Sequence, residues 1–134
     1  MQGRKWMKMD DNEKYENLAN AIIERAVEDY IVKVLALNKL LDNKLGWISK
    51  FAENEAKRKN PQFYTSTELQ AIYQRKVLGV KVEIEDIERF FHSDWYGTLT
   101  KVDGQALLKG VKQKIKDEHG INVDELQPKY TLCN

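Results

Sequence analysis

The strongest constraint on this chain is a run of apolar residues spaced three or four positions apart in its first third. The run begins at Tyr15 and ends at Leu45, with members at Leu18, Ile22, Ala26, Tyr30, Val34, Leu37 and Leu41. This spacing is typical of one face of an α-helix. Asp10, Asp11 and Asn12 supply N-cap residues before it, and Gly46 is the expected C-cap. Such a helix would be about 50 Å long, so a second element must lie along it.

The same period predicts a second long helix from Ser66 to His92. Thr65 and Glu68 form a capping-box pattern at its start. One segment inside it, Val80 to Glu85, alternates apolar and charged residues as a strand does, and Gly79 weakens a helix by about 1 kcal/mol relative to alanine. No other segment of the sequence alternates as clearly, so a partner strand is missing and we expect a helix.

Shorter helices are predicted from caps and helix breakers. One runs from Trp47 to Lys59 and stops before Asn60-Pro61, because proline disfavours a helical predecessor. A second spans Asp94 to Leu99 after a Ser93 cap. A third begins at a capping box formed by Thr100 and Asp103, continues to about Glu118, and ends at Gly120.

These elements predict an all-α domain of two long antiparallel helices with two or three shorter helices packed across one end. The length of 134 residues fits one domain, 1–134, with loosely ordered ends at 1–10 and 121–134. The pattern leaves open whether the long helices pair within one chain or between two copies as a homodimer.

The charge balance argues against a general attraction to nucleic acid or to anionic membranes. Lys and Arg total 22, Asp and Glu total 21, and the formal net charge is +1. The single cysteine, Cys133, favours a reducing compartment. The charged start resembles no signal peptide, and no apolar run reaches the length of about 18 residues of a membrane helix. We therefore expect a soluble cytoplasmic protein with no membrane partner.

The aromatic stretch from Glu88 to Leu108 has two interpretations. It contains Phe90, Phe91 and Trp95, which could line a pocket for a ligand or a base. A corner of the core is the commoner use of such residues. We expect the core, with Trp95 buried.

Catalytic and metal chemistry find little support in the sequence. His92, Ser93 and Asp94 are adjacent, whereas a catalytic triad needs groups converging from separate elements. Ser93 is explained as a helix cap. His119 has no metal-ligand spacing around it, and the pair Glu24 and Glu28 is typical of a solvated helix face. We expect no enzyme activity, no cofactor and no metal.

Two basic clusters are the predicted partner-binding residues. They are Lys57, Arg58 and Lys59 at the end of the predicted Trp47 to Lys59 helix, and Lys109, Lys112 and Lys116 on one side of the last helix. They could engage phosphates or an acidic protein surface. The alternative is that they form solvated lysine faces.

Two sequence blocks carry a resemblance to small proteins of phages and integrated elements of low-GC Gram-positive bacteria. The first block reads A-V-x-D-Y, and the second reads F-F-x-S-x-W followed by L-T-x-x-D-G. The matching positions are Ala26, Val27, Asp29, Tyr30, Phe90, Phe91, Ser93, Trp95, Leu99, Thr100, Asp103 and Gly104. The resemblance implies a mobile-element protein acting in the cytoplasm of a bacterial host.

By analogy with such elements, we expect a non-enzymatic protein that binds and inhibits or regulates a host macromolecule. The partner would be a host protein or a protein–nucleic acid complex. One example is a nucleic-acid-guided nuclease, the kind of partner that anti-CRISPR proteins inhibit. The alternative is an accessory protein that binds nucleic acid directly through its lysine-rich faces. Direct phosphate binding would weaken steeply with salt.

Overall fold

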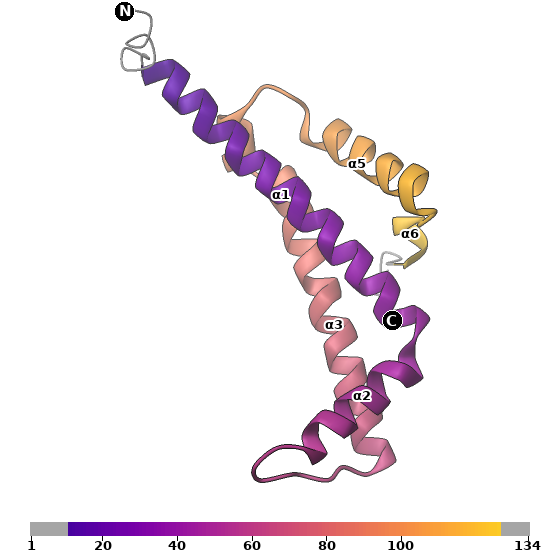
Figure 1. The fold of residues 1–134 in the computed structure, drawn as a ribbon. Helices are drawn as coiled ribbons and strands as arrows, with labels where there is room; N and C mark the ends of the chain where they lie inside the picture. Colours follow the sequence, from indigo (N-terminus) through magenta and orange to yellow (C-terminus); the bar gives the residue numbers. More distant parts are fainter. Residues whose placement is uncertain (1–10, 127–134) are drawn as a thin grey trace, which may run out of the picture.

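The computed structural model describes residues 11–126, and the regular secondary structure of this part is entirely helical. The prediction of an all-α fold is confirmed. The six helices of residues 11–126, shown in Figure 1, are α1 (Asp11–Asp42), α2 (Lys44–Ala56), α3 (Ser66–Phe91), α4 (Asp94–Leu99), α5 (Gly104–His119) and α6 (Val123–Leu126).

The two long helices, α1 and α3, pack against each other in antiparallel directions within one chain (Figure 1). Two tyrosine hydroxyls connect them. Tyr30 Oη of α1 donates to Glu88 Oε2 of α3 at 2.7 Å, and Tyr73 Oη of α3 donates to the Leu40 carbonyl of α1 at 2.9 Å. Residue 30 of α1 thus faces residue 88 of α3, and residue 40 of α1 faces residue 73 of α3. The two helices run in opposite directions, and these contacts define their antiparallel register.

The core lies between these two helices and is closed by the C-terminal third of the chain. Its long-helix residues are Tyr30, Val34, Leu37, Leu40, Tyr73, Val77, Val80, Ile84 and Phe91. The C-terminal third adds Tyr96, Leu108, Val111, Ile115, Ile121 and Val123. Burying such side chains stabilises the fold by about 1.5–3 kcal/mol each relative to leaving them exposed.

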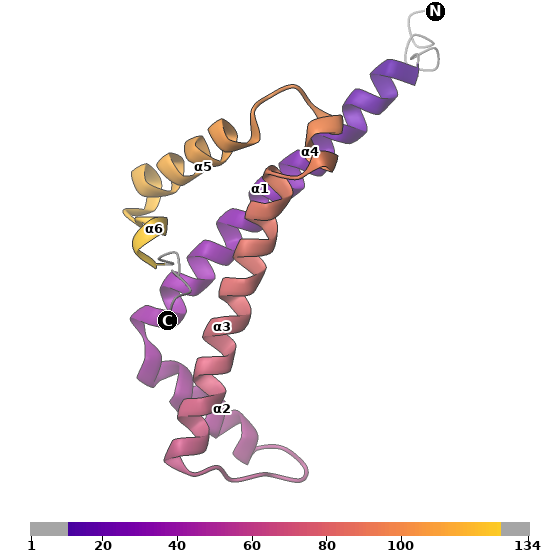
Figure 2. The same cartoon turned by 180° about the vertical axis from the view of Figure 1, so that it is seen from behind.

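The shorter helices are distributed more widely than across one end of the pair. Helix α2 packs beside the first turns of α3, and α4 lies near the other end of α3 (Figure 2). Helices α5 and α6 then return along the side of α1. The single-domain prediction placed loosely ordered ends at 1–10 and 121–134. The described part of the second end, 121–126, instead packs Ile121 and Val123 into the core, whereas 1–10 and 127–134, including Cys133, lie outside the described residues.

The end of α1 differs from the prediction. The helix stops at Asp42 rather than near Leu45, and Gly46 is not its C-cap but a residue of α2. Asn43 caps α2, its Oδ1 accepting a hydrogen bond from the Gly46 amide at 3.1 Å. The turn ends the predicted apolar face, so Leu45 is 74% exposed.

The segment Val80 to Glu85, whose alternating sequence resembles a strand, is part of helix α3, as expected. Val80 and Ile84 are four apart and buried, while Val82 is 42% exposed, because one helical face packs on α1. The capping box is present: the Thr65 amide donates to Glu68 Oε1 at 2.8 Å, and the Glu68 amide donates to Thr65 Oγ1 at 3.1 Å.

The aromatic stretch is a corner of the core, but its buried member was predicted wrongly. Trp95 is 57% exposed, whereas Tyr96 is 3% exposed. Ser93 does cap α4, accepting a hydrogen bond from the Tyr96 amide at 3.1 Å. The cap restarts the helical register, which turns Tyr96 toward Phe91, with ring centroids 5.7 Å apart. Trp95 keeps an edge contact with Phe90.

Helix α5 begins three residues later than the Thr100 box predicts. Its N-cap is Asp103, whose carboxylate accepts a hydrogen bond from the Ala106 amide at 3.2 Å. Thr100 instead ends α4 and accepts from the Val102 amide at 3.2 Å. Gly120 ends α5 with φ of 69°, as expected of a glycine C-cap.

Gly104 allows the start of α5 to approach the end of α3. A Cβ atom placed there would overlap the backbone carbonyl of Phe91 and press on the Tyr96 ring, whereas a Cβ at Gly79 would meet no atom within 4 Å. We expect Gly104→Ala to destabilise the protein by about 1–3 kcal/mol through overpacking. Gly79→Ala, the matched control, should stabilise it by about 0.5–1 kcal/mol. Urea unfolding of both variants measures this, and equal effects would contradict the close approach.

Candidate functional site

The first predicted basic cluster lies directly after α2, with Lys57 as the C-cap, and its positive charges are partly neutralised. Lys57 Nζ lies 3.4 Å from a Glu53 oxygen, and Arg58 Nη1 lies 3.1 Å from a Glu55 oxygen. Lys59 is exposed. The two ion pairs join residues of the same helix end, so they contribute little stability.

The second predicted cluster is brought together as expected. Lys109, Lys112 and Lys116 line one hollow of about 230 Å³ between α5 and α6. Lys109 and Lys116 are exposed, but Lys112 is half-buried. The three lysines therefore do not have the same role.

Lys112 joins a polar network that connects four helices. Its Nζ lies 3.0 Å from Asp124 Oδ1 of α6 and 3.9 Å from Glu88 Oε2 of α3. The same Glu88 oxygen accepts the hydrogen bond from Tyr30 Oη of α1 at 2.7 Å. Lys112 therefore holds α5 against α3 and α6 through ion pairs. Replacing Lys112 would disturb the packing of these helices as well as the surface charge. Lys109 and Lys116 are the residues with which to test this face.

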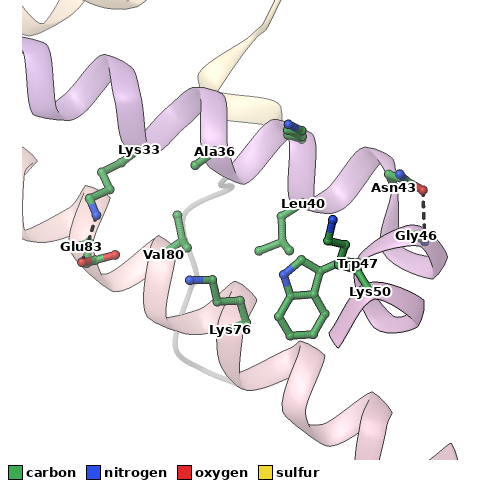
Figure 3. Close-up of a pocket in the computed structure, with 11 residues that line it drawn as sticks. Lys33, Ala36, Leu40, Asn43, Gly46, Trp47, Lys50, Lys76, Val80 and Glu83 are labelled. Atoms are coloured by element: carbon green, nitrogen blue, oxygen red, sulfur yellow. Dashed lines mark hydrogen bonds and ion pairs between the residues drawn. The ribbon is translucent and has the colours of Figure 1, made fainter. Parts of the chain in front are cut away.

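A third cationic surface, which sequence reasoning missed, is a groove of about 390 Å³ between α1, α2 and α3 (Figure 3). We call it the lysine groove. Its lining residues are Lys33, Ala36, Lys39, Leu40, Asn43, Gly46, Trp47, Lys50, Lys76, Val80 and Glu83. The four lysines come from three helices, with gaps of up to 26 positions between consecutive members (76 − 50 = 26). No local cluster in the sequence could indicate them.

The floor of the lysine groove is apolar and held rigidly. Leu40, Trp47 and Val80 point into the space between α1 and α3 in Figure 3. The Trp47 ring stacks on Phe51 at 5.4 Å between centroids and 15° between planes, and it meets Tyr73 at 5.8 Å. These contacts fix the indole at the point where α2 crosses the long helices.

The charges of the groove are mostly uncompensated. Lys33 Nζ pairs with Glu83 Oε2 at 3.2 Å, with both side chains partly exposed. The side chains of Lys39, Lys50 and Lys76 make no ion pair or hydrogen bond within the described residues 11–126. Four lysines and one glutamate give the lining a formal charge of +3 (4 − 1 = +3). An anionic group entering here would meet the ammonium groups of Lys39, Lys50 and Lys76, which are unpaired within residues 11–126.

The neighbouring His92, Ser93 and Asp94 serve the local fold. Ser93 Oγ donates to the Phe90 carbonyl at 2.6 Å while accepting from the Tyr96 amide. His92 ends α3 as its C-cap, and Asp94 begins α4. In the part of the chain that the structure describes, no three His, Cys, Asp or Glu side chains gather where they could hold a metal ion.

Comparisons with protein-family models, with curated proteins and with solved structures find no match to this chain. The resemblance to mobile-element proteins stays a prediction. Across residues 11–126, none of the helices combines the length and the apolar character that crossing a membrane requires.

Tyr30 and Tyr96 are two of the three buried tyrosines in residues 11–126, and replacing each of them tests the network, with Tyr96 outside it as the control. Burial, reinforced by the hydrogen bond to Glu88 and by the negative charges of Glu88 and Asp124, raises the pKa of Tyr30. Tyr96 Oη is buried and has no hydrogen-bond partner within the described residues. We expect Tyr30→Phe to cost about 1.5–3 kcal/mol, the value of a hydrogen bond to a charged group, and Tyr96→Phe to leave stability unchanged or slightly higher.

The effect of Tyr30→Phe should depend on pH in a defined direction. The raised pKa means that the stabilisation is complete below about pH 10, the ordinary tyrosine value, and is lost as the pH rises further. Wild-type stability should therefore fall above pH 10 by up to about 1.4 kcal/mol per pH unit from this residue, and the gap to Tyr30→Phe should narrow. Urea unfolding between pH 7 and 11 measures it. A gap that stays constant would show that Tyr30 is not protonated preferentially in the fold.

Proposed function

We propose that this chain is a non-enzymatic binding protein whose partner presents an acidic surface. The observation that carries the proposal is the lysine groove, where the side chains of Lys39, Lys50 and Lys76 surround an apolar floor and have no acidic partner among residues 11–126. Carboxylates of a partner would complement the cationic rim, which favours association with an acidic surface, and the floor supplies apolar burial. This combination is typical of protein recognition.

The proposal is compatible with the role implied by the sequence resemblance. A mobile-element protein that inhibits or regulates a host macromolecule, such as a nucleic-acid-guided nuclease, would act by occupying a surface of that macromolecule. The groove, the α5 lysines and the end of α2 offer three separate basic surfaces for such contacts. We place the action in the cytoplasm of a bacterial host.

Direct binding of nucleic acid is the second candidate function. The exposed pair Lys109 and Lys116 beside the hollow between α5 and α6 favours it. The near-zero net charge counts against it, because non-specific nucleic-acid binding depends on neutralising many phosphates. A protein partner therefore has the better support.

Capture from the lysate of a low-GC Gram-positive bacterium, with and without nuclease treatment, separates the two functions. We expect the immobilised full chain to retain a defined protein that survives nuclease and is reduced only moderately between ~50 and ~200 mM salt. Loss of all retained material after nuclease, with affinity falling by orders of magnitude over that salt range, would favour direct nucleic-acid binding instead. Retention of nothing beyond a bead-only control at ~50 mM salt would contradict both functions.

A further inference from the structure

We propose that the lysine groove binds an acidic amphipathic helix of the partner protein, with one large apolar side chain of that helix seated against Trp47. This inference rests on the proposed function and names the surface and the chemistry of its ligand. It commits to a peptide segment rather than a nucleic acid, for three reasons given by the groove itself.

The first reason is the apolar floor. Leu40, Trp47 and Val80 form a hydrophobic surface below the lysines. A groove of about 390 Å³ has room for a bulky side chain, and burying one stabilises a complex by the transfer of apolar area from water. Helices bind grooves in this way, through anchors repeated at one-turn intervals.

The second reason is the spacing of the cations. Lys33 and Lys39 are six residues apart on α1, which separates their backbones by about 9 Å along the helix. Lys76 lies on the opposite wall, on α3, and Lys50 comes from α2. The charges come from three helices around the groove, and Lys33 is already paired with Glu83. Cations spread over this distance and over three helices can meet several carboxylates on successive turns of one helix, whereas a single phosphate would reach only some of them.

The third reason is that the groove lacks the usual devices for nucleotides. Among the described residues, no arginine lines it, although arginine is the side chain best suited to bidentate phosphate recognition. The Gly46 amide at the start of α2 already donates to Asn43 Oδ1, so it is not offered to an anion. Phe51 stacks on one face of Trp47 and Tyr73 packs at an angle to it, which restricts the stacking of a base.

The test uses three defined probes with the full-length protein. The first is a 15-residue peptide with glutamates on one helical face and leucine and phenylalanine beside them. The second is a scrambled peptide of the same composition, and the third is a 15-nucleotide thymidine oligomer. NMR follows the indole signals of Trp47 and Trp95, assigned with Trp47→Phe and Trp95→Phe variants. We expect the amphipathic peptide to shift the Trp47 signal and leave Trp95 unchanged.

Charge-reversal pairs connect that binding to the lysines. Lys39→Glu with Lys76→Glu should weaken the amphipathic peptide at least tenfold. The matched control, Lys101→Glu with Lys114→Glu, changes the charge by the same amount outside the three basic surfaces and should alter affinity by less than twofold. All four positions are exposed, so both variants should retain the wild-type circular dichroism spectrum and melting temperature.

Each other outcome overturns the assignment. Equal binding of the scrambled peptide, or equal loss with both variant pairs, would reduce the effect to general charge attraction. Tighter binding of the oligonucleotide at Trp47 would make the groove a nucleic-acid site. If the indole signal of Trp47 does not shift at millimolar peptide, the groove does not bind a helix of this kind. If the lysate capture still retains a nuclease-resistant protein in that case, the proposed function survives and only this location fails.

Discussion

The register of α1 against α3, on which the rest of the structure depends, is set by two reciprocal hydrogen bonds between these helices. Each long helix contributes one buried tyrosine, Tyr30 from α1 and Tyr73 from α3, and each hydroxyl finds its acceptor on the other helix. Apolar packing alone allows related helices to slide by a turn, because methyl groups have no fixed partners. A buried hydroxyl without an acceptor costs about 1–3 kcal/mol, so the two tyrosines penalise every other register.

That register positions both basic surfaces of interest. It sets Lys76 and Val80 of α3 opposite the last turns of α1, and the Asn43 cap then directs α2 across the pair, which places Trp47 at the floor of the lysine groove. On the other side it presents Glu88 to Lys112, which holds α5 and α6. The polar network and the groove therefore belong to opposite sides of a single helix pair.

Much of this fold could be predicted from the sequence, because helical period and capping residues act locally. The Thr65–Glu68 box and the Ser93 cap are present as expected. The errors fall where a turn resets the helical phase: Trp95 was expected inside but Tyr96 occupies the core. The lysine groove could not be predicted, because its cations are scattered over three helices and meet only after α1 and α3 have aligned.

Native-state hydrogen exchange tests most directly whether α1 and α3 form one cooperative unit. The account predicts that the amides around Tyr30 to Leu37 and around Val77 to Ile84 exchange slowest and share one opening free energy, equal to that of global unfolding. The first turns of α1, where Tyr15 and Leu18 are at least half exposed, should exchange much faster. Different opening free energies for the two helix centres would show that they separate before the protein unfolds, and would contradict the account.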